Sequence, residues 1–199
     1  MPQAEVSRSV TVDLPDGWFA VDPGTSPDKA SIRTYLDHRI ADFAQLRPLR
    51  EPAIQAILQF AHDATSDRTL QAGLYIGSVG GAPVVATLTI SSVPLKESGT
   101  ANPRTLAIEV GSPQVGDVGL RDVGIVELPA GAAVRVRYLV ETGPDAEGSA
   151  GVWDVLQDWL PIAGGSEVVV VDLRTPSLPY ADTLIEEFEA ITEILALRT

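Results

Sequence analysis

The chain has 199 residues and a mass of 21.1 kDa, with 45% hydrophobic residues and a mean hydropathy of +0.14. These values are typical of a folded protein and suit one domain with its own core, so we expect residues 1–199 to form a single domain. The formal net charge of −13 disfavours nucleic acid as a partner, because such a surface repels a phosphate backbone.

The chain contains no cysteine, which excludes disulfides, zinc–thiolate sites and iron–sulfur clusters. The first residues lack the basic start and apolar core of a signal peptide, and no apolar stretch approaches the length of a membrane span. We therefore expect a cytoplasmic protein that neither inserts into a membrane nor carries a lipoprotein anchor.

The chain begins with two predicted strands. Residues 9–14 alternate between apolar and polar side chains, which is typical of a half-buried strand. Pro15, Asp16 and Gly17 predict a turn, and residues 18–21 a second strand. Trp18 and Phe19 are adjacent, so they should point into different layers of the core.

Two helices are predicted next. Ser26 and Pro27 have the chemistry of a helix start, and apolar residues recur at helical spacing to about Arg47. A second helix should run from Glu51 to about Ala64. Together they predict a helical hairpin, inserted between early strands, that covers a face of the sheet.

Further strands are predicted at residues 70–76, 83–93, 123–128 and 133–142. The signal is weak between Pro94 and Gly119. Asn102 and Pro103 favour a short helix there, although residues 106–110 would also suit a strand. Residues 143–151 are expected to form an exposed loop.

The last third predicts a strand pair followed by a helix. Residues 152–162 and 167–174 are extended runs, and Gly164–Gly165 suits the turn between them. The four consecutive valines, 168–171, indicate a central strand covered on both faces. Apolar residues then recur at three- and four-residue steps from Leu184, which predicts an amphipathic helix over about 180–197 that packs on this strand. The short connections predict an α+β fold with a mostly antiparallel sheet.

No residue set has a recognisable catalytic or metal-binding pattern. His38 and His62 are the only histidines. His38 lies beside Asp37 and near Asp42, but there is no His-x-x-x-His or Glu-x-x-His pairing, so we expect no metal, cofactor or catalytic residue. Asp154 and Asp158 share a strand face, and paired carboxylates can divide acid and base roles. More often, two such carboxylates are surface charges on an edge strand that keep the protein soluble.

Four residues are the candidates for a partner-binding surface. Trp153 and Trp159 share one face of their strand, which suits either a binding platform or core packing under a helix. Arg135 and Arg137 alternate with apolar residues on their own strand. Because arginine and tryptophan often dominate interface energies, we expect these four residues on the side of the sheet opposite the terminal helix.

Both ends of the chain resemble the PsbP-like superfamily, which includes Mog-type Ran-binding proteins and LpqN-type actinobacterial proteins. The resemblance rests on residues 10–18, VTVDLPDGW, and on the closing Leu173-Arg174-Thr175-Pro176 before a helix with Phe188 and Ile191. It implies an α+β fold with a C-terminal helix on one sheet face. The missing anchor cysteine and the large helical insertion at 26–65 depart from the pattern.

The resemblance implies a non-catalytic protein that binds other proteins, as an adaptor or chaperone linked to bacterial secretion. The alternative from another class is a small-molecule carrier, or an enzyme that uses carboxylates in a sheet–helix cleft. A closed pocket lined by ionisable groups would favour this alternative. A broad exposed apolar patch would favour protein binding.

Overall fold

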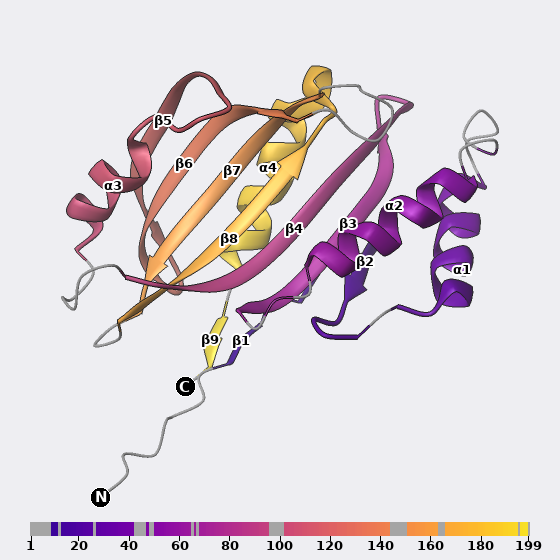
Figure 1. The fold of residues 1–199 in the computed structure, drawn as a ribbon, viewed down its shortest axis with the longest axis horizontal. Helices are drawn as coiled ribbons and strands as arrows, with labels where there is room; N and C mark the ends of the chain where they lie inside the picture. Colours follow the sequence, from indigo (N-terminus) through magenta and orange to yellow (C-terminus); the bar gives the residue numbers. More distant parts are fainter. Residues whose placement is uncertain are drawn as a thin grey trace, which may run out of the picture.

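The computed structural model confirms an α+β fold with a mostly antiparallel sheet. It describes residues 9–11, 13–25, 27–41, 47, 50–64, 66, 68–95, 102–143, 151–162, 166–194 and 196–198. A seven-stranded antiparallel sheet forms the centre of the molecule (Figure 1). Its spatial order is β2 (Trp18–Val21), β3 (Thr69–Val79), β4 (Ala82–Pro94), β8 (Glu167–Thr175), β7 (Gly151–Pro161), β6 (Gly131–Thr142) and β5 (Asp117–Leu128).

Strand β8 is the central strand that the valine run predicts. It lies between β4 and β7, and residues 168–171 are all buried. Val169 and Val171 join the cluster under the terminal helix, whereas Val168 and Val170 join a cluster on the other face. The unbroken β-branched run is therefore explained by apolar cover on both sides of the strand. The predicted turn at Gly164–Gly165 lies outside the described residues.

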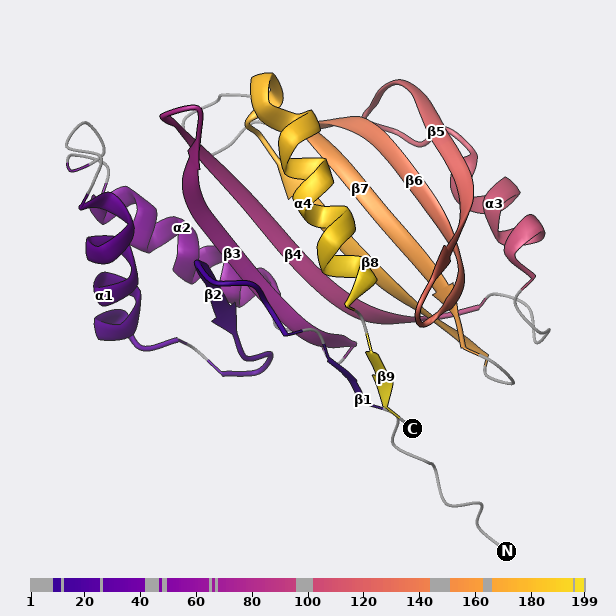
Figure 2. The same ribbon diagram turned by 180° about the vertical axis from the view of Figure 1, so that it is seen from behind.

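Helix α4 (Ala181–Glu193) covers one face of the sheet, after a short 3-10 turn at Leu178–Tyr180 (Figure 2). Leu184, Phe188 and Ile191 are buried against apolar side chains of β4, β7 and β8. The terminal helix is thus part of the core, as its spacing predicts. It ends at Glu193, earlier than the predicted end near 197, and residues 196–198 form a strand instead. We call this side of the sheet the α4 face.

The other face of the sheet carries three helices, divided between its two ends (Figure 1). Helices α1 (Lys29–Ile40) and α2 (Arg50–Asp63) form the predicted hairpin and pack on Leu74 and Ile76 of β3. The cap of α1 is Asp28, whose carboxylate accepts from the Ser31 amide, so the helix begins later than Ser26 and Pro27 suggest. The predicted end of this helix, residues 42–46, lies outside the described residues.

Helix α3 (Pro103–Gly111) covers the opposite end of the same face. Of the two structures that the sequence allows around residues 102–110, the helix is the one that forms, not the strand. Asn102 caps it by accepting a hydrogen bond from the Arg104 amide. Leu106 and Val110 pack on Val134 and Val136 of β6. Between α2 and α3, parts of β4, β8 and β7 are left without a helix above them (Figure 1).

Strand β1 (Ser9–Thr11) does not join the large sheet. It pairs antiparallel with β9 (Ala196–Arg198), so segments near the two ends of the chain lie side by side. Trp18 and Phe19 enter different clusters, as their adjacency predicts. Within the described ranges, no helix combines the length and the apolar character needed to cross a bilayer.

Candidate binding surfaces

Arg135 and Arg137 lie on the α4 face, so the expectation that they share a surface opposite the terminal helix is wrong. Arg135 donates to Asp158 in two bonds of 2.8 Å, and its Nη1 donates to Glu189 of α4 at 2.7 Å. Arg137 forms the same kind of bridge between Asp154 and Asp182, both at 2.7 Å. The two arginines therefore tie the sheet to α4.

The same bonds correct the interpretation of Asp154 and Asp158. Both lie on β7, an inner strand, and their exposed fractions are 3% and 0%, so they are not edge-strand charges. Each carboxylate is paired with an arginine of the neighbouring strand β6. A buried carboxylate needs such a partner, because burial without one is very costly. These carboxylates have a structural explanation.

Trp153 and Trp159 lie on the other face of the sheet, since side chains alternate along β7. Trp159 packs beside Val134 and Val170 in the cluster under α3, and Trp153 lines an open trough between α2 and β7. Core packing under a helix is thus confirmed for Trp159, whereas a binding platform at Trp153 stays a prediction. The structure separates the four candidates into an arginine pair and a tryptophan pair on opposite faces.

The face that carries the tryptophans changes in chemistry from one end to the other. Strand register places its side chains in rows that cross β6, β7, β8 and β4. At the α3 end the rows are mostly apolar, and toward β4 they become polar. The three rows are Tyr138–Val155–Arg174–Thr87, Val136–Gln157–Asp172–Thr89 and Val134–Trp159–Val170–Ser91.

A chain of hydrogen bonds runs across these rows. Trp159 Nε1 donates to Gln157 Oε1 at 3.1 Å, and Gln157 Nε2 donates to Asp172 Oδ2 at 2.7 Å. Arg174 donates to both oxygens of Asp172, with Nε and Nη2 each at 2.6 Å. Hydrogen bonding to Asp172 raises the pKa of Arg174, so this guanidinium stays charged. The network orients one arginine toward the uncovered part of the sheet.

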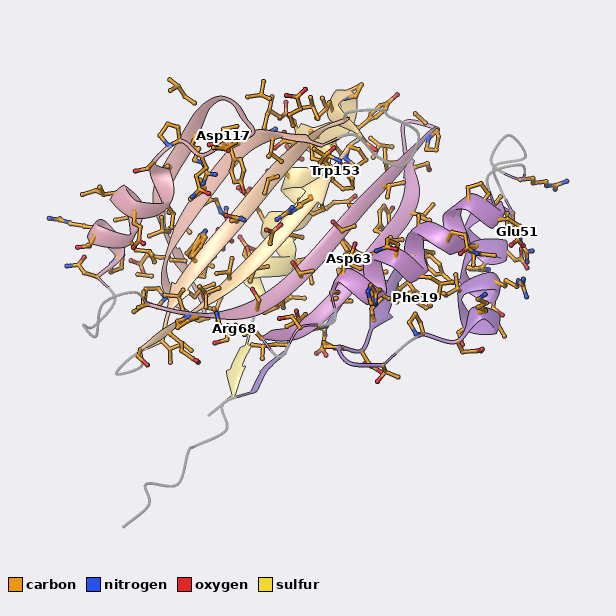
Figure 3. The ribbon with its side chains drawn as sticks, in the orientation of Figure 1. Phe19, Glu51, Asp63, Arg68, Asp117 and Trp153 are labelled. Atoms are coloured by element: carbon orange, nitrogen blue, oxygen red, sulfur yellow. The ribbon has the colours of Figure 1, made fainter. Side chains whose placement is uncertain are left out.

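The uncovered part of this face is a trough with a volume of about 590 Å³. Its floor is made by β4 and β8, and Figure 3 shows Asp63, Arg68 and Trp153 around it. Its lining includes Asp63, Arg68, Thr87, Thr89, Trp153 and Arg174. A second hollow of about 390 Å³ lies beside α3 and is lined by Tyr138, Gln157 and Trp159. Both volumes are in the range of small-molecule sites.

The outer strand β5 has an exposed edge. It is 12 residues long and pairs only with β6 in the described sheet. Eight large hydrophobic side chains are exposed in the described part of the chain, and five of them lie in the α3–β5 region. These five, which we call the β5 patch, are Ile108, Val115, Val118, Leu120 and Ile125. They are not all on one face of the sheet, because Val118 pairs with Leu139 on the α4 face and Ile125 pairs with Val134 on the other.

The two histidines do not meet. His38 is exposed on α1 beside a small hollow with Arg39 and Ser78, and His62 is exposed near the end of α2. Within the described residues, no group of three or more histidine, cysteine, aspartate or glutamate side chains is placed to hold a metal ion.

Comparisons of this chain with protein-family models, curated proteins and solved structures returned no match. Two surfaces of the chain could serve binding, the trough and the β5 patch. Asp172 and Arg174 are not among the residues that the sequence singles out for binding, although their i, i+2 spacing on a strand predicts side chains on one face. The alternating Thr87, Thr89 and Ser91 were a second signal for a polar sheet face.

Proposed function

We propose that the protein is a non-catalytic binding protein, with an adaptor-like role, that captures an extended segment of a partner protein along β5. The observation that carries this proposal is the coincidence of a long free strand edge with the β5 patch. An unpaired edge offers backbone N–H and C=O groups to an incoming strand, a common mode of peptide recognition. Exposed apolar side chains nearby would provide its specificity.

Three of the usual protections of an edge strand are missing from β5, although it has a register shift between Val118 and Asp122 and an inward ion pair, Asp117–Arg121. Natural edges are commonly blocked by lysine, proline or very short length. Strand β5, with the sequence DVGLRDVGIVEL, contains neither lysine nor proline, and Leu120 is 89% exposed. Its arginine, Arg121, is turned inward to Asp117. The other edge of the sheet, β2, has only four residues.

Charge favours a basic partner. The net charge of −13 would accelerate encounter with a positively charged protein, and this attraction weakens as salt rises. Asp122 and Glu127 lie exposed on β5 itself and would face basic side chains of the added segment. Capture of the partner should therefore be weaker at high ionic strength.

The test is capture of partners from the native host by the wild type and by Leu120→Lys and Ile125→Lys. A lysine on the free edge should prevent strand addition and abolish capture. Ile194→Lys is the matched control, because it places the same charge on another exposed apolar residue, 52% exposed, at the end of α4. Equal recovery by the edge variants and the wild type would contradict the proposal.

The second part of the test measures by sedimentation whether the purified protein is a monomer or a dimer. Pairing of two β5 strands would make a dimer, so a wild type that sediments as a dimer with monomeric edge variants would identify the occupant as a second copy. A monomeric wild type that loses its partner only in the edge variants supports capture of a different protein.

A further inference from the structure

We propose that the trough binds a small organic molecule with an oxyanion group, either carboxylate or phosphate, and that Arg174 holds this group. The site lies on the sheet face between α2 and β7 and is separate from the β5 edge. The proposal therefore does not depend on partner capture.

The trough lies where the side chains of the sheet face change from apolar to polar. Under α1 and α2 the sheet presents Leu74 and Ile76, and under α3 it presents Val134 and Val136. Between these apolar patches, β4 presents the hydroxyl groups of Thr87, Thr89 and Ser91. A helix packed here would bury polar groups, at a cost unless they were paired, so the polar stretch suits water or a hydrogen-bonding ligand.

Arg174 is held in a fixed direction by its neighbours. Asp172 is 8% exposed and accepts three hydrogen bonds, two from Arg174 and one from Gln157. The side chain of Arg174 is 44% exposed and lines the trough. Because Arg174 pairs with Asp172 side-on, through Nε and Nη2, its Nη1 faces away from Asp172. The arginine is thus oriented before any ligand arrives.

Arg174 has N–H groups that its hydrogen bonds to Asp172 do not use. A guanidinium has five N–H groups, and Arg174 uses two of them on Asp172. In Arg121 and Arg135 the Nη1 atom also has a partner, Val110 O at 2.8 Å and Glu189 at 2.7 Å. Nη1 of Arg174 donates no hydrogen bond within the described part of the chain. These free N–H groups of Arg174 suit a ligand that brings acceptors and negative charge, whereas Asp63 and Asp172 balance the charges of Arg68 and Arg174 within the lining itself.

Two neighbours extend the site beyond one arginine. Thr87 is the cross-strand partner of Arg174 and offers a hydroxyl beside the guanidinium. Trp153 provides an aromatic surface for the body of the ligand. A volume of about 590 Å³ accommodates a small organic molecule rather than a single inorganic ion. The site therefore suits an aromatic or similarly flat carboxylate or phosphate.

The experiment uses three probes with one ring: phenylacetate, phenyl phosphate and the neutral phenylacetamide. Titration of the isotope-labelled protein, followed by amide and arginine Nε–H resonances, should show binding of at least one anion with shifts in β4 and β8. The neutral amide should bind at least about tenfold more weakly, because it cannot form a charge-assisted pair. Binding of phenyl phosphate alone, or of phenylacetate alone, distinguishes the two oxyanions within the proposal.

Arg174→Gln should weaken binding of the anion about tenfold or more, whereas Arg104→Gln, the same charge change at an exposed α3 residue, should not. Thr87→Val serves as a second variant should Arg174→Gln fail to fold, and it should also weaken binding. Leu120→Lys should bind the anion like the wild type, which separates this site from β5. The proposal is overturned by equal binding of phenylacetamide, by failure of both anions to bind, or by unchanged affinity in folded Arg174→Gln.

Discussion

Asp117 and Arg121 lie four residues apart on β5, at the register shift between Val118 and Asp122. The irregular strand brings the two side chains together, with Nε–Oδ2 at 2.8 Å and both side chains only 5% exposed. The Arg121 guanidinium lies 3.9 Å from the centre of the Tyr138 ring, and its Nη1 donates to Val110 O. One ion pair thus joins β5 to α3 and β6.

The pair makes stability depend on pH. The hydrogen bond from Arg121 lowers the pKa of Asp117, although burial opposes this shift. In the unfolded chain the carboxyl titrates near about 3.9, so below that pH the unfolded state binds a proton that the folded state does not. The stabilisation is therefore present above about pH 4 and is lost as pH falls through the folded pKa.

Urea unfolding of the wild type, Asp117→Asn and Asp122→Asn between pH 5 and pH 2 checks this prediction. Asp117→Asn should be less stable at pH 5 and should lose less stability on acidification than the wild type. Asp122→Asn removes the same charge from an exposed side chain of β5 and serves as the control. Parallel pH profiles for the wild type and Asp117→Asn would contradict the assignment.

Gly17 and Gly24 allow a matched test of a turn. Both have positive φ, 95° and 80°, which disfavours any side chain by about 1–2 kcal/mol. A Cβ at Gly17 would also overlap the guanidinium of Arg39, whereas a Cβ at Gly24 meets nothing within 4 Å. Gly24→Ala should therefore cost about 1 kcal/mol in free energy of unfolding. Gly17→Ala should cost more, because the displaced Arg39 guanidinium would leave its place over the Tyr75 ring, 5.1 Å from the ring centre. Equal costs would show that Arg39 moves aside freely.

At the scale of elements, α4 is attached to the sheet by two kinds of contact. Leu184, Phe188 and Ile191 form its apolar stripe, and Arg135 and Arg137 reach from β6 to Glu189 and Asp182 beside it. The apolar contacts are expected to provide most of the stability, because the desolvation of buried ion pairs offsets much of their attraction. The ion pairs join α4 to β6 at two points of the helix, Asp182 and Glu189.

Phe188→Ala tests the contribution of the apolar stripe. The side chain is fully buried, so its loss should reduce the free energy of unfolding by about 3–5 kcal/mol. Ile108→Ala on α3 is the control, since Ile108 is 76% exposed and should change stability little. Thermal and urea unfolding measure both variants. A shift of only a degree or two for Phe188→Ala would contradict its place in the core.

At the scale of the whole molecule, the sheet joins all the covered regions. Strands β4 and β8 contribute to the cluster under α4 and also to clusters on the other face. We expect the described parts to unfold together for this reason. The same arrangement leaves two surfaces for binding, the trough between α2 and β7 and the free edge at β5, at different places on one rigid sheet.

The sequence by itself determined the elements that depend on local pattern. Apolar residues alternate along 83–93, valines fill 168–171, and apolar residues recur at helical spacing after Leu184. These three repeats predict the elements found there, which are β4, β8 and α4. The pattern also placed Trp153 with Trp159 on one face, and Arg135 with Arg137 on one face.

Which face of the sheet lies under α4 depends on contacts between residues far apart in the chain. Periodicity says that two side chains share a side, but not whether α4 or the open trough lies there, because helix docking involves residues far apart in the chain. Asp158 therefore looked like a surface charge until register placed it opposite Arg135, with Glu189 above them. Arg174 was overlooked for the same reason, since its partners Asp172 and Gln157 come together only when β7 and β8 pair.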